Sequence, residues 1–325
     1  MLENQLSRYG AIAKSLPFTF GKIFFVVKTS ESYFADFANE FPVDRDGVVR
    51  VYGSVAEVNT AMRDGYNDVA ILDGNSNHSL SSMLTISKNR VHYIGLDYLI
   101  GDRREYGQST RITMGVTAAA TDLFAVKNTG IRNSFLGIKF MSGNTLTQAI
   151  GTFGEGGEYS VFRNCEFYNS KKLNSDTHAE MVLNGDSPQF FNCTFGSLAD
   201  SVDGNKVRPA ILLTRDTVAT GKVTRDAYFD RCRFWKNAGG SNTTMIKSGA
   251  TDVERIMEFH DCQFIANPLG STPDVAISSA TLTQGMIILT GDTCATGCTK
   301  IATADGIFNC TPARVATATI GIQAT

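Results

Sequence analysis

The chain has few prolines, a single tryptophan and no long apolar run. Its 325 residues contain 7 Pro, 1 Trp and 4 His, against 30 Gly. The most apolar stretch near the start, residues 18–27, is interrupted by Gly21 and Lys22 and is far shorter than the roughly 20 residues that span a bilayer. We therefore expect no membrane partner. The first residues also lack a basic start that leads into an apolar core and a small-residue cleavage site, so no signal peptide is expected.

The chain also lacks an excess of charge of either sign. Lys and Arg number 30 and Asp and Glu 32, which gives a formal net charge of −2. No basic run of the kind that binds nucleic acid is present, so we predict no nucleic-acid partner. Hydrophobic residues make up 42% of the chain, enough for a core. Abundant Gly, Thr, Ser and Asn favour strands and turns over helices, so we predict a mostly β fold.

One pattern of aromatic residues and cysteine recurs along the chain. In "VFRNCEF", "PQFFNCTF", "YFDRCRF" and "EFHDCQF", a phenylalanine stands three positions before a cysteine and another stands two positions after it. The cysteines of this column are Cys165, Cys193, Cys232 and Cys262, and the column extends with substitutions to Leu96, Ile138 and, in part, Cys310. Side chains alternate strictly along a flat strand. Two same-facing residues three positions apart therefore predict a bend between two strands.

The residue just before the column indicates how the chain bends. This position is occupied by Gly95, Gly137, Asn164, Asn192, Arg231, Asp261 and Asn309. Gly, Asn and Asp tolerate left-handed backbone geometry best, so we predict a corner made by one left-handed residue. Successive corners lie 27 to 48 residues apart, a period typical of solenoids and propellers.

The repeat predicts a right-handed, single-stranded parallel β-helix. Apolar runs such as "MVLNGD" and "AILLTRD" precede the corners, which indicates at least two strands in each coil, and we expect three. Leucine-rich repeats would need Leu at most inward positions, and propeller blades need roughly 40 or more residues each. In a β-helix the Phe and Cys columns become internal ladders, so we expect the cysteines to be reduced core residues.

Two segments precede or open the solenoid. Val55, Val58 and Met62 fall on one face of a short helix expected at about residues 54–63, which would cap the first coil. Residues 1–48 belong to no repeat and are predicted to form an N-terminal arm or attachment segment, with the β-helix domain spanning residues 49–325.

Catalytic motifs are scarce in the sequence. Glu155 and Glu158 in "FGEGGEYS" form the best candidate catalytic pair, because β-helix glycosidases use two acids a few ångströms apart. A solvated glycine-rich turn also explains these residues, and we favour that interpretation. No nucleophile elbow, phosphate loop, dinucleotide fingerprint or zinc ligand set is present, so we predict no cofactor and no metal.

The order of these segments resembles the β-helical virion proteins of tailed bacteriophages. The stretch "GKIFFVVKTSESYFADFANEFPVDRDGVVRVY" in particular is similar to the leader of phage structural proteins, and "DVAILDG" then opens stacked coils. The resemblance implies a homotrimer that decorates a capsid or forms a fibre or spike. The chain departs from depolymerase tailspikes in being short, without a separate head-binding domain.

Two functional hypotheses follow from the sequence and this resemblance. The first is a non-enzymatic capsid decoration or cement protein on the phage head surface, assembled in the host cytoplasm and bound to the major capsid protein or other virion proteins. The alternative is a tailspike or receptor-binding protein that binds or cleaves a host surface glycan. Under the first hypothesis, apolar side chains of the arm pack on a neighbouring subunit or on the capsid. The predicted contact residues are Tyr9, Phe18, Phe20, Phe24 and Phe25.

Overall fold

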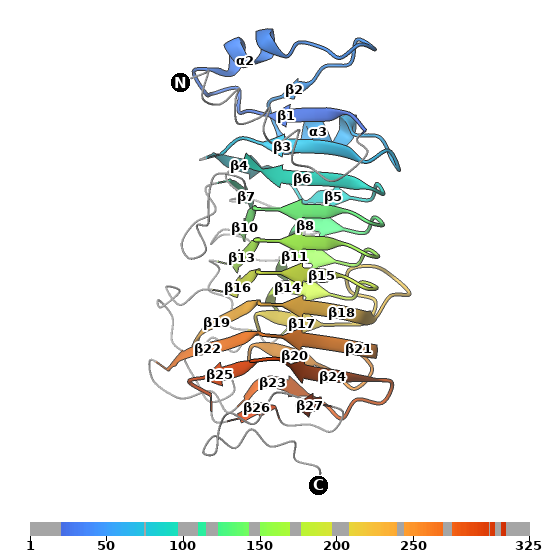
Figure 1. Ribbon diagram of the computed structural model, residues 1–325, viewed down its shortest axis with the longest axis vertical. Helices are drawn as coiled ribbons and strands as arrows, with labels where there is room; N and C mark the ends of the chain where they lie inside the picture. The colour runs from blue at the N-terminus through green and yellow to red at the C-terminus, as the bar shows by residue number, and fades with distance from the viewer. Residues whose placement is uncertain are drawn as a thin grey trace.

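The protein is an elongated parallel β-helix built from three sheets (Figure 1). The computed structural model describes residues 21–74, 76–96, 110–114, 123–142, 150–169, 177–196, 208–238, 244–268, 275–298, 300–302 and 307–309. Each coil places one strand in each sheet, and the chain then rises to the next coil. All strand pairs within the three sheets are parallel, which confirms the predicted fold class and the third strand of each coil.

Among the described residues, sheet A has eleven strands and sheets B and C have eight each. The strands of sheet A, in spatial order, are β2 (Val51–Tyr52), β1 (Ile23–Val26), β3 (Asp68–Leu72), β6 (Val91–Gly95), β9 (Ser134–Leu136), β12 (Val161–Arg163), β15 (Gln189–Phe191), β18 (Thr224–Asp230), β21 (Val253–His260), β24 (Gly285–Thr290) and β27 (Ile307–Asn309). Those of sheet B are β4 (Asn77–Leu80), β7 (Arg111–Met114), β10 (Lys139–Ser142), β13 (Glu166–Asn169), β16 (Thr194–Gly196), β19 (Arg233–Ala238), β22 (Gln263–Pro268) and β25 (Cys294–Thr296). Those of sheet C are β5 (Leu84–Ile86), β8 (Phe124–Asn128), β11 (Gly151–Glu155), β14 (Ala179–Leu183), β17 (Ile211–Leu213), β20 (Ile246–Ser248), β23 (Val275–Ser279) and β26 (Lys300–Ala302).

The corner between sheets A and B has the predicted one-residue geometry. Asn164, Asn192, Arg231 and Asp261 have φ between 51° and 52°, and Gly137 has φ 64°. The chain therefore turns sharply enough for side chains of both flanking strands to point into the same interior. Gly95 is an exception, because it ends β6 without a positive φ. Tyr98, two positions after Leu96, lies outside the described residues. The next described strand of sheet B is β7, where Ile112 pairs with Phe140.

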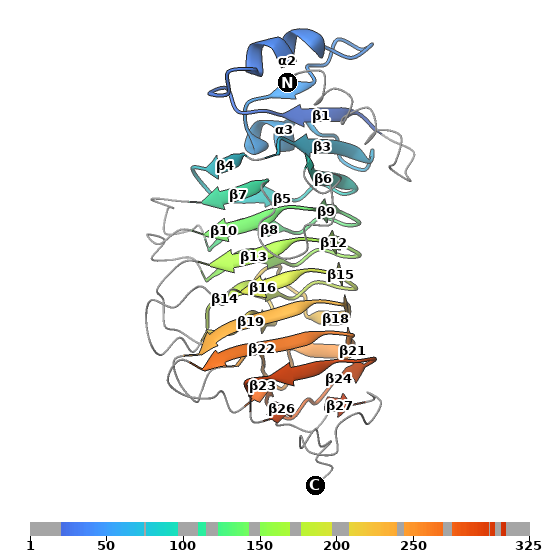
Figure 2. The ribbon, with the colours of Figure 1, turned by 60° about the vertical axis from the view of Figure 1, so that its left-hand side comes forward.

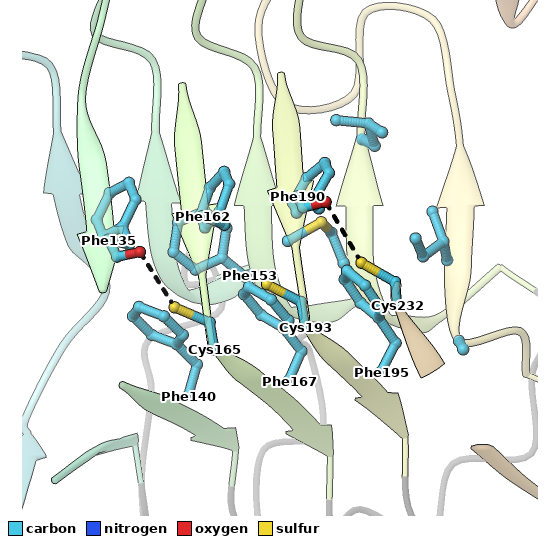
Figure 3. Close-up of a cluster of buried hydrophobic side chains, with 14 of the residues drawn as sticks. Phe135, Phe140, Phe153, Phe162, Cys165, Phe167, Phe190, Cys193, Phe195 and Cys232 are labelled. Carbon is cyan, nitrogen blue, oxygen red and sulfur yellow. Dashed lines mark hydrogen bonds between the residues drawn. The ribbon is translucent and has the colours of Figure 1, made fainter. Parts of the chain in front are cut away.

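Aromatic and cysteine ladders fill the interior (Figure 3). The Phe residues on both sides of the corner are less than 2% exposed, and successive rings stack with centroids 4.6 to 5.1 Å apart across the central coils. The four column cysteines are free thiols and fully buried, as predicted. The Sγ of Cys165 lies 3.3 Å from the Phe135 carbonyl oxygen, to which it donates a weak hydrogen bond. The ladders are therefore structural.

One coil does not show the motif in its sequence. Leu289 pairs with Phe259, and Ala295 pairs with Phe264, so these residues occupy the two Phe positions of the next rung. Thr293 takes the cysteine position, where its Oγ1 accepts a hydrogen bond from the Cys262 amide. Gly291, with φ 61°, makes this corner one residue longer than the others. Cys310, which the sequence placed on the next rung, lies outside the described residues.

Two short helices complete the N-terminal end (Figure 1). Helix α3 (Val55–Ala61) begins with a capping box between Ser54 and Glu57. Val55, Val58 and Met62 are at most 2% exposed and pack into the main core, which confirms the predicted capping helix. Helix α2 (Phe34–Glu40) lies over the outer face of sheet A. No helix of the described residues is long and apolar enough to cross a membrane.

The domain boundary predicted at residues 48 and 49 does not separate an arm from the solenoid. Strand β1 is hydrogen-bonded between β2 and β3, so residues 23–26 already belong to sheet A. Phe37 of α2 and its neighbours form a second apolar cluster with the outer side chains of β1, β3 and β6. The segment from β1 to β2 is therefore an integral part of the β-helix, because it buries apolar residues that sheet A would otherwise expose.

Candidate functional site

Glu155, the first of the two predicted catalytic acids, lies inside the β-helix. Its carboxylate is fully buried at the end of β11. Asn128 Nδ2 donates to both of its oxygens, at 3.2 and 2.9 Å, and Ser160 and the Gly157 amide donate to Oε1. Burial raises the pKa of Glu155 to about 7, although these hydrogen bonds act in the opposite direction. A polymeric substrate has no access to this group.

Glu158 lies on the surface, at the corner between sheets C and A. Its carboxylate forms an ion pair with Lys222 and its side chain is 29% exposed. Gly156 and Gly157 carry the chain from the interior to the surface between the two acids. Glu155 and Glu158 therefore do not form a surface acid pair, and they do not have the geometry of the predicted catalytic pair.

The predicted attachment residues divide between buried and undescribed positions. Phe24 is 1% exposed in the main core, and Phe25 is 4% exposed and packs edge-on against Phe37, with ring centroids 5.4 Å apart. These two rings are used within the chain and offer no contact surface to a partner. Tyr9, Phe18 and Phe20 lie outside the described residues.

Strands β13, β16, β19 and β22 of sheet B lie toward the viewer in Figure 2. The outer face of this sheet carries a column of side chains that includes two aromatic residues. The residue that follows each inward Phe points outward and stacks in register with its counterpart in the next coil. This outward column consists of Ser79, Thr113, Met141, Tyr168, Gly196, Trp235, Ile265 and Thr296. Tyr168 and Trp235 are both half-buried, and Gly196 on β16 stands between them. Strand spacing places these two aromatic residues roughly 9–10 Å apart along the helix axis.

A polar column runs beside the outward column, two residues earlier on each strand. Its members are Asn77, Arg111, Lys139, Glu166, Thr194, Arg233, Gln263 and Cys294. Lys139 Nζ lies 2.8 Å from a Glu166 oxygen and 5.6 Å from the Tyr168 ring centroid. The two columns together form a surface of aromatic faces flanked by hydrogen-bond donors, which we call the sheet B face.

The sequence analysis missed this face, although the repeat contained the signal. Tyr168 directly follows Phe167, and Trp235 directly follows Phe234, and the aromatic motif had already placed both phenylalanines inside. The predicted corner therefore also implies that the side chain of Trp235, the single tryptophan, points outward from sheet B.

A buried ionic group lies behind the sheet B face, at the corner with sheet C. Glu180 Oε1 lies 3.3 Å from Arg208 Nε and 3.6 Å from Lys236 Nζ, and the three side chains are at most 4% exposed. Oε2 of Glu180 has no hydrogen-bond partner among the described residues. Because these groups are enclosed, we assign them a structural role.

Three side chains at the corner between sheets A and B could approach one cation. The ligand atoms of Asp230, His260 and Asp261 all lie within 4.8 Å of one another. Their oxygens and nitrogens already have partners, because Arg231 donates to Asp230 at 2.7 Å and His260 Nδ1 lies 3.0 Å from Thr290 Oγ1. Nothing else at this corner indicates a bound ion.

Comparison with known proteins identifies the architecture. No family model matches the sequence, and no curated protein matches it in a sequence search. A pectin methylesterase in complex with a hexasaccharide is similar in structure, with a TM-score of 0.53, 11% identity and coverage of 92% of each chain. The pectin methylesterase PemA from Erwinia chrysanthemi has a TM-score of 0.51 at 10% identity, covering 93% of this chain and 92% of its own. A pectate lyase has a TM-score of 0.54 at 10% identity, and the match covers 84% of this chain and 63% of the lyase. At these identities the likeness establishes the fold.

These neighbours correct the predicted function. The prediction of a non-enzymatic capsid decoration or cement protein is contradicted, because these three neighbours, each with a TM-score above 0.5, are enzymes named for pectin or pectate. The phage virion origin, the homotrimer and the head-surface location stay predictions.

Proposed function

We propose that the protein binds an extended polysaccharide along the sheet B face. The observation that carries this proposal is the pair Tyr168 and Trp235, which occupy one outward column with Gly196 between them. Aromatic rings offer large rigid apolar faces with a polar edge, and the apolar faces of sugar rings pack against such surfaces. Gly196 stands between Tyr168 and Trp235 with φ 88°, and a Cβ there would lie 2.1 Å from the Trp235 carbonyl oxygen, so no side chain is possible at the middle position of the column.

The polar column supplies groups that suit sugar hydroxyls. Lys139, Arg233 and Gln263 stand beside the aromatic residues and carry hydrogen-bond donors. The stacking of equivalent positions about every 4.8 Å gives the face a regular repeat along the helix axis, which suits a linear polymer of repeating units. The neighbouring folds support the proposal, since a pectin methylesterase of this architecture is known in complex with a hexasaccharide.

The proposal concerns binding and leaves the reaction open. Glu166 is the carboxylate of the sheet B face among the described residues, and it is paired with Lys139. Glycoside hydrolysis uses two carboxyl groups on either side of the bond, and one paired acid does not provide that arrangement.

The proposal is tested by measuring polysaccharide affinity in aromatic variants. Affinity electrophoresis in gels that contain polygalacturonate, alginate or dextran would compare the wild type with Tyr168→Ala and Trp235→Ala. We expect retention by at least one polymer, weakened about tenfold by either change, which is ~1.4 kcal/mol. Tyr228→Ala is the matched control, because Tyr228 is also half-buried but lies on the outer face of sheet A. Equal retention of all four proteins would refute the proposal, as would no retention by any polymer.

A further inference from the structure

A small polar cavity lies at the N-terminal end of the sheet B face. It has a volume of about 170 Å³ and lies between the segment after β1, the start of α3 and strand β4. Its lining residues are Lys28, Thr29, Ser30, Gly53, Ser54, Val55, His78 and Ser79. Pockets that enclose drug-sized ligands measure roughly 300–1,000 Å³, so this cavity suits one sugar unit or one charged group.

The cavity offers hydrogen-bond donors that the described part of the chain does not use. Within that part, no hydrogen bond or ion pair engages the Lys28 ammonium or the hydroxyls of Ser30 and Ser79. The carboxylate of Glu57 accepts from the amides of Gly53 and Ser54 and does not line the cavity. The cavity therefore presents one positive charge and several hydroxyls.

His78 strengthens the polar character of the cavity wall. It is 3% exposed, its Nε2 lies 3.4 Å from the Asp73 carbonyl oxygen, and its Nδ1 has no hydrogen-bond partner among the described residues. Burial lowers the pKa of His78 to about 4, so the ring is neutral at ordinary pH. Lys28 is then the charged group that lines the cavity.

The register of sheet B connects this cavity to the proposed binding face. Ser79 lines the cavity and is also the first residue of the outward column, since it pairs with Thr113. Thr113 pairs with Met141, and Met141 with Tyr168. Three rungs of about 4.8 Å separate Ser79 from Tyr168, roughly 14 Å. A polymer stacked on Trp235 and Tyr168 and extended toward the N-terminal end would reach the cavity.

We propose that this cavity binds the carboxylate of a uronate unit at one end of the polysaccharide. The inference rests on the proposed function for its polymer, but the cavity can be tested without one. An ammonium and a carboxylate form a charge-assisted hydrogen bond, which is stronger than one between neutral groups. The hydroxyls of Ser30 and Ser79 provide further contacts that distinguish a sugar acid from a simple anion.

The test measures binding of monosaccharides to the full chain by calorimetry or ligand-observed NMR. The probes are galacturonate, galactose and inorganic sulfate. We expect galacturonate to bind at least tenfold more tightly than galactose or sulfate. Lys28→Gln should remove this preference, Ser79→Ala should weaken galacturonate binding, and Lys28→Arg should retain part of it. Lys127→Gln, a half-buried lysine on β8 of sheet C, should behave as the wild type.

The outcomes separate this inference from the proposed function. If Lys28→Gln leaves the galacturonate preference intact, or if sulfate binds as tightly as galacturonate, the uronate site is wrong. If Tyr168→Ala and Trp235→Ala do not affect polymer retention but Lys28→Gln still abolishes the monosaccharide preference, the cavity assignment holds and the polymer-binding face fails. If the aromatic variants lose polymer retention but Lys28→Gln keeps the preference for galacturonate, the polymer-binding face holds and the cavity assignment fails.

Discussion

The phenyl rings of Phe162 and Phe190 lie nearly parallel in successive coils, with centroids 4.7 Å apart and planes inclined by 12°. Phe229 continues the stack from Phe190, with centroids 4.6 Å apart. The ring of Phe190 therefore has an aromatic face on both sides and is fully buried. Phe190 therefore connects three successive coils.

Truncation of this ring should be strongly destabilising. We expect Phe190→Ala to lower the free energy of unfolding by about 3–5 kcal/mol, because it removes a buried ring and leaves a cavity. Phe191→Ala is the control, since the next residue is half-buried on the outer face of sheet A and should cost much less. Denaturant unfolding measures both values. Similar losses for the two variants would be inconsistent with an internal Phe190 ladder.

The corner residue Asn164 allows a test of backbone geometry. Its φ is 51°, a region that costs a residue with a Cβ roughly 1–2 kcal/mol. Asn164→Ala should therefore be less stable than Asn164→Gly by about 1 kcal/mol. Both variants lose the 2.6 Å hydrogen bond from Asn192 Nδ2. The difference between their free energies of unfolding therefore measures the cost of the left-handed backbone conformation. Equal stability of the two variants would argue against a left-handed corner.

Thiol reactivity should distinguish the column cysteines from the terminal ones. Cys294 is exposed and should react first with a thiol reagent in the native protein. Cys298 should follow more slowly, because burial raises its pKa to about 11. The four column cysteines should react only on unfolding. Mass spectrometry of a Cys310→Ser variant would follow each site, and fast labelling of Cys193 or a disulfide between column cysteines would contradict the packing.

Glu155 should make the stability of the protein depend on pH. Burial raises its folded-state pKa to about 7 from an ordinary value of 4.5, so the folded state holds a proton that the unfolded state has lost between these values. The contribution of Glu155 to stability is fully present below about pH 4.5 and is lost as pH rises through 7. We expect a loss of about 3 kcal/mol over this window.

The variant Glu155→Gln isolates this contribution. His78 and His92, whose pKa values burial lowers to about 4, act in the opposite direction and are common to both proteins. The wild type minus variant difference in unfolding free energy should therefore fall as pH rises from 4.5 to 8. Parallel pH curves for the two proteins would mean that Glu155 titrates normally.

The architecture could be predicted from the sequence because its determinants repeat. The spacing of Phe190, Cys193 and Phe195 fixes both a bend and two inward directions, and the same constraint recurs with each coil. The rung formed by Leu289, Thr293 and Ala295 could not be predicted from the motif, because a core position requires a suitable volume and polarity and not one residue type. In that coil an aliphatic side chain and a threonine hydroxyl satisfy the same positions.

The site residues were harder to predict for two physical reasons. A carboxylate beside glycines in a turn normally indicates solvent, and the sequence does not show that Asn128 and Ser160 from elsewhere surround Glu155. The pairing of β1 with β3 joins segments without any shared pattern, so the burial of Phe24 and Phe25 depends on tertiary contacts alone. The position of Trp235, in contrast, was available from the repeat.

The placement of β1 between β2 and β3 protects the first described strand of the chain. The Phe25 amide donates to the Arg50 carbonyl on one side, and the Val69 amide donates to the Lys22 carbonyl on the other. A strand held on both sides cannot separate from the sheet unless two rows of hydrogen bonds break together, whereas β2, at the edge of sheet A, is held among the described residues by β1. The amide hydrogens of β1 should therefore exchange with solvent more slowly than those of β2.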